Sequence, residues 1–572
     1  MKTTIVALLM FLPVILSCQE STSTNEMEKP AVTTAAATAT ELSFATDVAD
    51  RMGQLPKTTI DYDHGLLDAN QTAVVAKLIE ASKQIDEIFW RQVSESNPVW
   101  RAQLQKQASS SPQAQAALNY FLNMKGPWDS LKKEEPFVLV GPKPPGAAFY
   151  PPDMTKEQFE SWLPAHPNDK AAFQGLFTVI RRQNGNLVAI PYSQYYRDQL
   201  IPAAAKLREA AALAKNASLK AYLNKRADAF LSDDYFASDL AWMDLNSDIE
   251  VVIGPYEVYE DNLFNYKASY ESFVTVVDKP ESAKLAVYAK HLPDMEKNLP
   301  IPDEHKNPNR GSDSPIRVVQ EIYTAGDARH GVQTSAFNLP NDERVREAKG
   351  SKKVLLKNVM DAKYEQSGKP IAERVLDPSQ VSLLSFDAYF NHVLFHELSH
   401  GLGPGIIKGP KGEKVEARLL LKDLYSTIEE CKADVLGIWN IRYAMDHSLL
   451  SSFSKEQLYA TDAGLMFRSM RFGLDEAHGR GTALQWNWYR EKGGIVPASD
   501  GRFRIDAVKM AEANRSLANE LLMIEALGDY NRARTLLDKY GVTNPEIQAT
   551  IARLADIPVD IDPVYPAAGE TK

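Results

Sequence analysis

The run His396-Glu397-Leu398-Ser399-His400 is an HExxH pattern, and its residue types and spacing are suited to metal chemistry. On a helix, residues four apart lie on one face, so the rings of His396 and His400 can converge on one zinc ion. Glu397 directly follows the first histidine and can polarise a water molecule held by the metal. The pattern therefore predicts a zinc hydrolase.

The segments around this pattern are typical of helices that can position it. Apolar residues recur at helical spacing from Leu383 to Leu394, and Gly401 to Gly405 supply the glycines and proline expected after a helix end. Further along, Ile428 to Asp434 form part of a second helical pattern that can supply a carboxylate as third ligand. Two histidines and one glutamate, with one position open, form the ligand set of a catalytic rather than a structural zinc site.

His392 lies one turn before His396 and leaves three interpretations open. It can be a ligand of a shifted site, a hydrogen-bond donor next to the site, or a packed histidine without metal contact. The packed histidine is favoured, because only His396 and His400 enclose a glutamate beside the first ligand.

The HELSH run and the later run EECKAD, Glu429 to Asp434, resemble the dipeptidyl-peptidase III family, zinc peptidases that remove dipeptides from peptide N-termini. Most members carry HExxGH and EECRAE. The shorter motif is similar to that of a bacterial subgroup and of the peptidase-like part of plant Nudix hydrolase 3. The similarity extends over about residues 235 to 565. No Nudix-type signature is apparent between residues 45 and 230, so the plant protein's other activity is not implied.

The resemblance implies a role for each polar residue of the two runs. Glu397 is the expected general base. The family places carboxylates that orient the histidine rings at two further positions, for which a solvated acidic helix face is the alternative. The implied zinc ligands are His396, His400 and Glu430, with one zinc per chain, and the implied orienting carboxylates are Glu429 and Asp434.

The segment Ile253 to Asp261 is similar to a family segment that carries a glutamate for the substrate's N-terminus and a tyrosine for the oxyanion. Those roles fall on Glu257 and Tyr259. A carboxylate pairs well with a substrate ammonium, and a phenol can donate to a developing oxyanion. The alternating Glu-x-Tyr order is also an ordinary strand pattern, which stays open as the alternative.

Two more segments carry the resemblance. Asn338 and Asn341 are similar to family asparagines whose amides hold the peptide's amino end, although Asn and Pro together also favour a plain turn. His478 lies at the position of a histidine that the family uses at the transition state. Animal members carry an arginine four residues later, where this chain has Thr482; Arg480 is the candidate substitute.

The N-terminus is typical of a bacterial lipoprotein signal. An apolar stretch from Ile5 to Leu16 is too short to span a bilayer and ends just before Ser17-Cys18. Cleavage before Cys18 would leave a lipidated cysteine that anchors the protein to a membrane outside the cytoplasm, in the periplasm or at the cell surface. An ordinary secretory signal is the alternative. Residues 19–42 have the composition of a flexible tether.

Composition excludes several classes of protein. A net charge of −11 without basic clusters argues against nucleic-acid binding. Only two cysteines, Cys18 and Cys431, argue against a disulfide framework. Cys431 neighbours Glu430, so its thiolate is a conceivable zinc ligand, but a small buried hydrophobe is favoured.

The periodicity predicts a mostly α fold with a smaller β component, and the chain length predicts two lobes. The resemblance implies that a wide cleft separates the lobes and that the zinc site lies on helices of the catalytic lobe. Expected helices are 71–92, 200–231, 383–400, 419–445, 465–491 and 507–540, and expected strands are 135–140, 249–253 and 272–277. The predicted domains are a signal peptide (1–17), a tether (18–42), a substrate-binding lobe with the β component (43–270, with 325–380 as a further candidate part) and a mainly helical zinc lobe (271–572).

These observations predict an exported, lipid-anchored zinc exopeptidase that acts on peptides with a free N-terminus. A zinc hydrolase of the same fold that acts on other peptides or amides is the first alternative. A non-catalytic peptide-binding lipoprotein is the second, and Glu397 counts against it, because a pure binder needs no base beside its metal. The sequence predicts no oligomeric state.

Overall fold

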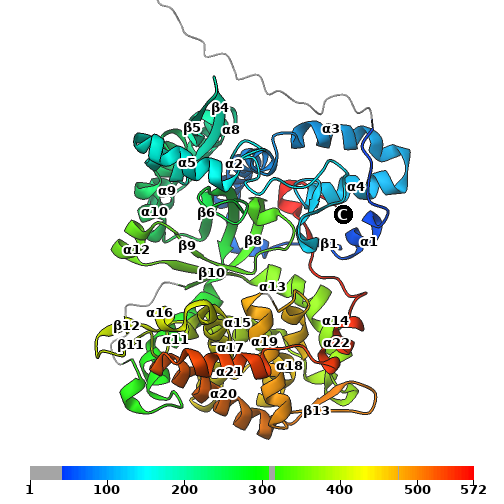
Figure 1. The fold of residues 1–572 in the computed structure, drawn as a ribbon, viewed down its shortest axis with the longest axis vertical. Coiled ribbons are helices and arrows are strands. Elements are labelled where there is room, and N and C mark those ends of the chain that lie inside the picture. The colour runs from blue at the N-terminus through cyan, green and yellow to red at the C-terminus, as the bar shows by residue number, and fades with distance from the viewer. Residues whose placement is uncertain (1–40, 308–315, 475, 572) are drawn as a thin grey trace, which may run out of the picture. The chain divides into compact units, whose positions relative to one another are not determined.

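Helices form most of the chain and one five-stranded sheet is its largest β element, which confirms the predicted mostly α fold with a smaller β component (Figure 1). The computed structural model describes residues 41–307, 316–474 and 476–571. The predicted signal peptide, Cys18 and nearly all of the predicted tether lie outside these residues. Within the described ranges, no helix has the length and apolarity that a membrane span needs.

The five-stranded sheet has the order β6-β7-β8-β10-β9. Strand β7 pairs antiparallel with both β6 and β8, β10 runs parallel to β8, and β9 pairs antiparallel with β10 at the edge. The sequence analysis located β6 and β7 but missed the other three strands. The bounds are β6 Ile249–Glu257, β7 Ser269–Val277, β8 Ile316–Gly326, β9 Ala336–Leu339 and β10 Lys352–Leu356.

Strand β10 lies between two hydrophobic cores. Successive side chains of a strand point to opposite faces. Val354 and Leu356 are buried in the first core, whereas Leu355, between them, is buried in the second. Lys353 therefore belongs to the face of β10 that is turned toward the second core, and this orientation matters for the site described below.

The first core packs helices on the sheet face that carries Val354 and Leu356. Helix α2 contacts β6, β7 and β8, and α8 packs along α2. The prediction of one helix over residues 200–231 is wrong, because the chain leaves α8 and starts α9 at Asn216, whose side chain accepts a hydrogen bond from Leu219 N. The helices are α2 Ala69–Val93, α8 Arg197–Leu213, α9 Ala217–Ser232 and α10 Phe236–Met243.

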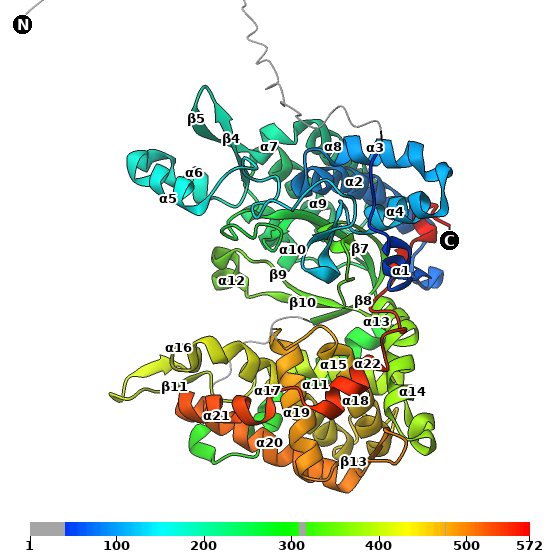
Figure 2. The same cartoon turned by 45° about the vertical axis from the view of Figure 1, so that its right-hand side comes forward.

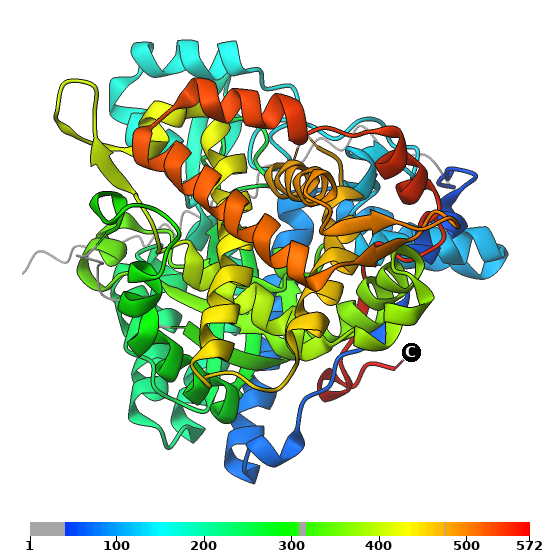
Figure 3. The same cartoon turned by 90° about the horizontal axis from the view of Figure 1, so that it is seen from below.

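The second core is helical, and Figure 3 shows α20 and α21, in orange and red, against the other helices. Two runs that were expected as single helices are pairs. Gly473 and Gly528, both with positive φ, break them between α18 and α19 and between α20 and α21. The helices are α11 Lys279–Lys297, α13 Lys357–Lys363, α14 Lys369–Val375, α15 Phe386–Ser399, α16 Ala417–Leu421, α17 Tyr425–Asp446, α18 Lys455–Met470, α19 Ala477–Glu491, α20 Ala507–Leu527 and α21 Tyr530–Tyr540.

Short elements complete the described residues, including the β11–β12 hairpin beside α16 in Figure 2. The strand expected over 135–140 shortens to the two residues of β3. The remaining elements are α1 Val48–Gly53, β1 Lys57–Thr59, α3 Asn97–Gln107, α4 Pro112–Asn123, β2 Trp128–Asp129, β3 Glu135–Pro136, α5 Lys156–Ala165, α6 Lys170–Gln174, β4 Thr178–Gln183, β5 Asn186–Pro191, α7 Tyr192–Tyr195, α12 Glu343–Lys349, β11 Ile406–Lys408, β12 Lys414–Glu416, β13 Ile495–Pro497, β14 Phe503–Ile505, α22 Pro545–Ala552 and β15 Asp562–Val564.

The two cores do not divide the chain at one point. The first core draws on residues from Ile60 to Val359 and again on Ile561 and Tyr565, while the second draws on residues from Leu285 to Ile557. The C-terminal strand β15 pairs in parallel with β1 near the start of the described chain. The predicted boundary after residue 270 falls inside β7, and the division into two lobes with a cleft stays a prediction.

Candidate active site

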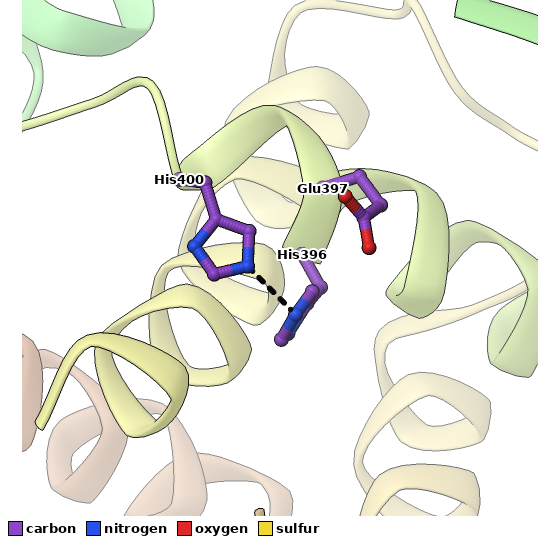
Figure 4. Close-up of side chains that lie close together, drawn as sticks. All are labelled: His396, Glu397 and His400. Carbon is purple, nitrogen blue, oxygen red and sulfur yellow. Dashed lines mark hydrogen bonds between the residues drawn. The ribbon is translucent and has the colours of Figure 1, made fainter. Parts of the chain in front are cut away.

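Helix α15 carries the HExxH residues in its last turn (Figure 4). Ser385 begins the helix by accepting a hydrogen bond from Ala388 N, and His400 ends it. The imidazole rings of His396 and His400 lie on one face, with their Nε2 atoms 3.1 Å apart. The predicted helical spacing therefore brings the two rings together.

Helix α17 packs closely against α15 and supplies the third donor atom. The two backbones approach each other at Gly437, where a Cβ atom would lie 3.1 Å from His396 N. Glu430 places its Oε2 atom 3.4 Å from His396 Nε2 and 3.7 Å from His400 Nε2. This oxygen is buried and has no hydrogen-bond partner. Three atoms that can bind a metal ion, the two Nε2 atoms and Glu430 Oε2, thus lie within 3.7 Å of one another.

The other ring nitrogens are occupied by carboxylates of α17. Nδ1–H of His396 donates to Asp434 over 2.7 Å, and Nδ1–H of His400 donates to Glu429 over 2.8 Å. In the neutral rings these bonds place the proton on Nδ1, which leaves Nε2 as the lone-pair nitrogen on the side of Glu430. Glu429 and Asp434 therefore lie where ring-orienting carboxylates are needed.

The carboxylates around the histidines favour positive charge. Burial works against a charged His396, but Asp434 and Glu430 outweigh it and raise the pKa of that ring to about 10. For Asp434, burial is likewise outweighed, here by His396, so that its pKa lies well below the usual range. The pKa of Glu430 is lowered too, because its contacts with the histidines outweigh burial. A cation between the three donors is therefore electrostatically favoured.

The donor set fits a tetrahedral metal ion. Ligand atoms about 2.0–2.1 Å from a zinc ion lie roughly 3.3 Å from one another. The three observed separations, 3.1, 3.4 and 3.7 Å, bracket that value. Two imidazoles and one carboxylate suit zinc, and to varying degrees cobalt, manganese or iron.

Glu397 lies beside this centre, since one donor atom each of His396, Glu397 and His400 fall within 4.8 Å of one another. Its carboxylate pairs with Lys353 of β10, with Lys353 Nζ 3.0 Å from Oε2. Burial would raise the pKa of Glu397, but Lys353 and His396 outweigh burial and hold this pKa below its usual range. Glu397 is thus an ionised carboxylate suited to accept a proton.

A cavity of about 460 Å³ opens at the centre. His396, Glu397 and His478 line it, together with Ala336 next to β10. An apolar wall lies on the α15 and α18 side. Its members are Tyr389, Val393, Leu465, Met466 and Phe472. The cavity is large enough for side chains of a peptide next to the metal donors.

His478 is close to the centre and Arg480 is not. At the start of α19, Nδ1 of His478 lies 3.5 Å from Glu430 Oε2, and 56% of the side chain is exposed. Thr482 lines the cavity. Arg480 instead donates from Nε to Gly541 O over 3.4 Å, on the side of α21, so its guanidinium does not replace the family arginine here.

The residues expected to bind the substrate's amino end lie on the sheet and are not among the residues that line this cavity. Glu257 ends β6, and Asn341 Nδ2 donates to Tyr256 O over 3.1 Å. Tyr259 is 73% exposed, and Asn338 is exposed on the edge strand β9. The structure brings the metal donors together; these four residues are outside the cavity lining, and Asn338 is paired with Lys353 in the β9–β10 register.

The carboxyl groups near Glu257 repel one another's charge. Burial and the charge of Asp327 raise the pKa of Glu257. Burial and the charge of Glu257 raise the pKa of Glu271 well above its usual value. The charge of Glu257, followed by burial, also raises the pKa of Tyr259. At this end of the sheet, burial and neighbouring carboxyl groups therefore disfavour the ionised forms of Glu257 and Glu271.

His392 and Cys431 are engaged elsewhere. Nε2–H of His392 donates to Asp434 O over 3.1 Å, and its Nδ1 lies 3.7 Å from Asp462. Cys431 is buried in the second core, where burial raises the pKa of its thiol well above the usual value. Cys431 therefore has the geometry of a packed residue, whereas His392, which lines the cavity and donates to Asp434 O, has that of a hydrogen-bond donor next to the site.

Sequence analysis missed three residues with a role at the centre. Gln485 Nε2 donates to Asp434 over 3.2 Å, and Lys432 Nζ lies 2.9 Å from Glu429, so both support the orienting carboxylates. Lys353 belongs to a strand that was not predicted. Lys432 lies within the EECKAD run and was recognisable there, whereas no spacing connects Lys353 or Gln485 to the motif.

Comparisons with known proteins agree with the geometry. The model of "Peptidase family M49" matches residues 176–415. Dipeptidyl-peptidase III of Caldithrix abyssi is 53% identical, with a TM-score of 0.87 over 90% of this chain and 98% of that one. The enzyme of the same name from Corallococcus sp. strain EGB is 40% identical, with a TM-score of 0.76 over 92% and 98%. Nudix hydrolase 3 of Arabidopsis thaliana is 38% identical over 88% of this chain and 72% of its own length.

Proposed function

Because the chain belongs to peptidase family M49, the dipeptidyl-peptidase III family, and is a metallopeptidase, we propose that it uses zinc to release dipeptides from peptide N-termini. The family membership agrees with the resemblance predicted from the sequence. One observation carries the proposal: Nε2 of His396, Nε2 of His400 and Oε2 of Glu430 converge beside Glu397, and His396 and Glu397 line one cavity.

His396, His400 and Glu430 would hold one zinc ion per chain. The unpartnered, buried Oε2 of Glu430 supports this assignment, because a buried carboxylate oxygen without a donor is costly unless a cation satisfies it. When bound, zinc acts as a Lewis acid toward a carbonyl oxygen and lowers the pKa of a water molecule. Glu429 and Asp434 would keep the two imidazoles in the required tautomers.

Glu397 would act as the general base and then as the general acid. Its carboxylate would accept a proton from the attacking water and pass it to the leaving amine, as positioned carboxylates do in proton transfer. The lowered pKa of Glu397 supports the ionised starting state. Its place on the cavity wall supports access to the scissile bond.

Oxyanion stabilisation would come from His478 and Tyr259. His478 lies 3.5 Å from Glu430 on the cavity wall and is mostly exposed, so its ring can turn toward a substrate. Tyr259 is exposed and is not among the residues that line the cavity, so its phenol would reach the oxyanion through a rearrangement on substrate binding.

The amino end of the substrate would bind Glu257, Asn338 and Asn341. A substrate ammonium would pair with Glu257 and restore a charge that burial and Asp327 now disfavour. Because one end of the peptide is fixed there and the other lies over the metal centre, the cut would fall two residues in. A free N-terminus is therefore the expected requirement.

The experiment uses an Arg-Arg-naphthylamide substrate, its N-acetylated analogue, a chelator and added zinc. Cleavage of the free-amine form alone, lost with chelator and restored by zinc, supports the proposal. Equal cleavage of both forms indicates a zinc hydrolase for other peptides or amides. Binding of peptides without any cleavage, in the zinc-loaded protein, indicates a peptide-binding protein and contradicts the proposal.

We also propose that the protein is an exported lipoprotein, on the sequence around Cys18 alone. Metabolic labelling with a radioactive fatty acid should modify the wild-type chain and leave Cys18→Ala unlabelled. Labelling of neither chain would point to an ordinary secretory signal.

A further inference from the structure

Lys353 is the side chain through which the sheet reaches Glu397. It shares its face of β10 with Leu355, which is buried in the second core, while Val354 between them is buried in the first. The neighbouring lysine, Lys352, points to the other face and donates to Trp242 O. Strand alternation thus directs Lys353 alone toward α15.

The ammonium of Lys353 makes two contacts with one residue. It donates to the backbone oxygen of Glu397 over 2.7 Å and lies 3.0 Å from Oε2 of the same residue. Because α15 ends at Ser399, the Glu397 carbonyl is among the last four of the helix, which lack regular intrahelical partners. A cation at a helix C-terminus is also favoured by the helix dipole.

The two contacts restrict the carboxylate of Glu397. The backbone contact fixes the ammonium relative to α15, and the side-chain contact then fixes Oε2 relative to the ammonium. Of the two carboxylate oxygens, Oε2 is the one that pairs with the ammonium. A carboxylate held through one oxygen keeps the second oxygen and its lone pairs available in a defined direction.

Strand β10 pairs with β9, and β9 carries residues on the substrate side of the site. Lys353 is opposite Asn338 in the β9–β10 register, and Ala336, opposite Leu355, lines the cavity. Residues opposite each other in antiparallel strands project to the same face. Phe337, on the other face of β9, packs its ring 4.5 Å from Phe273. Asn338 on the edge strand is therefore paired with Lys353, and the ammonium of Lys353 contacts Glu397, the proposed base.

We propose that Lys353 is a positioning residue that holds Glu397 through Oε2 and its backbone oxygen, leaving Oε1 to take the proton of the attacking water. The inference rests on the proposed function, since it assigns Glu397 the role of base. Lys353 also sets the distance between Glu397 and β9. The peptide bound at this edge strand and the proton acceptor therefore keep a fixed separation.

The first test compares steady-state kinetics of wild type, Lys353→Met and Lys357→Met on the free-amine dipeptide substrate. Lys357 is the matched control, because it is a half-buried, ion-paired lysine whose partner, Glu281, lies outside the cavity. Misplacement of a catalytic group by about 1 Å costs roughly 10²-fold in rate. We expect Lys353→Met to lower kcat by about 10- to 100-fold with KM within about twofold, and Lys357→Met to leave both near wild type.

A contrast with the residue opposite separates positioning from substrate binding. Asn338→Ala should raise KM and leave kcat largely unchanged, the reverse of Lys353→Met. If Lys353→Met changes KM alone, the lysine binds substrate and the proposal is wrong. If Lys353→Met raises kcat, the lysine restrains the base and the proposal is equally wrong.

Chemical rescue covers the case in which a variant is only unstable. For Lys353→Ala, n-propylammonium should restore at least about a tenth of the lost kcat, whereas tetramethylammonium, which has no N–H donor, should not. Thermal unfolding and zinc content are measured on the same samples. Full zinc content and a native melting curve without any rescue would overturn the proposal. Absence of wild-type cleavage would instead refute the proposed function.

Discussion

The carboxyl groups of α17 and those of the sheet differ in the direction of their pKa shifts, although both sets are largely removed from solvent. On α17, the pKa of Asp434 and the pKa of Glu430 are lowered, because histidine rings outweigh the effect of burial. On the sheet, burial raises the pKa of Glu257 and, more strongly, that of Glu271. The charges of neighbouring carboxyl groups raise both pKa values further. The first set is organised around histidine rings, whereas the second is buried among carboxyl groups that raise one another's pKa values.

This difference separates two tasks. The metal centre is built by two packed helices, and its ligand atoms lie at separations suited to a metal ion. The proposed amino-end site is built from a strand end and an edge strand, and its side chains are partly exposed. A fixed metal centre and an amino-end site completed by the substrate's own ammonium would account for both patterns.

Removal of the base should have the largest effect and tests the metal side of the comparison. Glu397→Ala removes the proton acceptor but none of the three donor atoms, so kcat should fall by about 10²- to 10⁴-fold. Zinc content, measured by atomic absorption, should stay near one ion per chain. An active variant with a full complement of zinc would contradict the assigned role.

Weakening an orienting carboxylate should change metal affinity next. Asp434→Asn keeps the size of the side chain but removes the charge that favours the Nε2-directed tautomer of His396, so zinc affinity should fall by about 10- to 100-fold. Competition with a chromogenic chelator measures it. Asp446→Asn, at the exposed end of the same helix, is the matched control and should bind zinc as wild type does.

A change on the sheet should leave the metal alone. Glu257→Gln removes the proposed partner of the substrate ammonium, and a hydrogen bond to a charged group contributes about 1.5 kcal/mol or more, so kcat/KM should fall by about tenfold or more. Zinc affinity should not change. Glu343→Gln, on the exposed face of α12, is the control. If Glu257→Gln lowers cleavage of free-amine and acetylated substrates equally, the glutamate does not bind the amino end.

The sequence predicted the helical site better than the sheet, for a physical reason. The four-residue spacing of His396 and His400 places them on one helix face without help from the rest of the fold. The residues that contact those rings were predicted from the family resemblance, because the local sequence does not indicate which residues of α17 face α15. The contact through Gly437 decides that. Lys353 depends on strand order and register, which emerge only when β10 pairs with both β8 and β9.

Helix ends show the same limit. Apolar periodicity runs on through Gly473 and Gly528, so residues 465–491 and 507–540 were each predicted as one helix. The backbone turns at these glycines because they adopt positive φ, which periodicity does not detect. The third strand of the sheet, β8, was missed because residues of both cores make its pattern nearly continuous in place of alternating.

A change in stability, with no expected change in the metal site, tests whether burial alone keeps sheet carboxyl groups neutral. Glu321 on β8 is buried, and burial raises its pKa to about 7, although Tyr565 donates a hydrogen bond to it over 2.6 Å. Because the folded value exceeds the unfolded value of about 4.5, folding binds a proton between these limits. The stabilisation is therefore complete below about pH 4.5 and is lost as pH rises through about 7.

Glu321→Gln replaces the neutral acid by a neutral amide that can still accept the Tyr565 hydrogen bond. The free energy of unfolding, measured with urea, should be similar for the two proteins at pH 5. At pH 8 the variant should be the more stable by up to roughly 3 kcal/mol, since it has no proton to lose. Glu347→Gln, exposed on α12, should follow wild type at both pH values. If the wild-type protein is as stable as Glu321→Gln at pH 8, Glu321 is ionised in the folded state without a cost. The contrast between the sheet and α17 would then be confined to the carboxyl groups around Glu257.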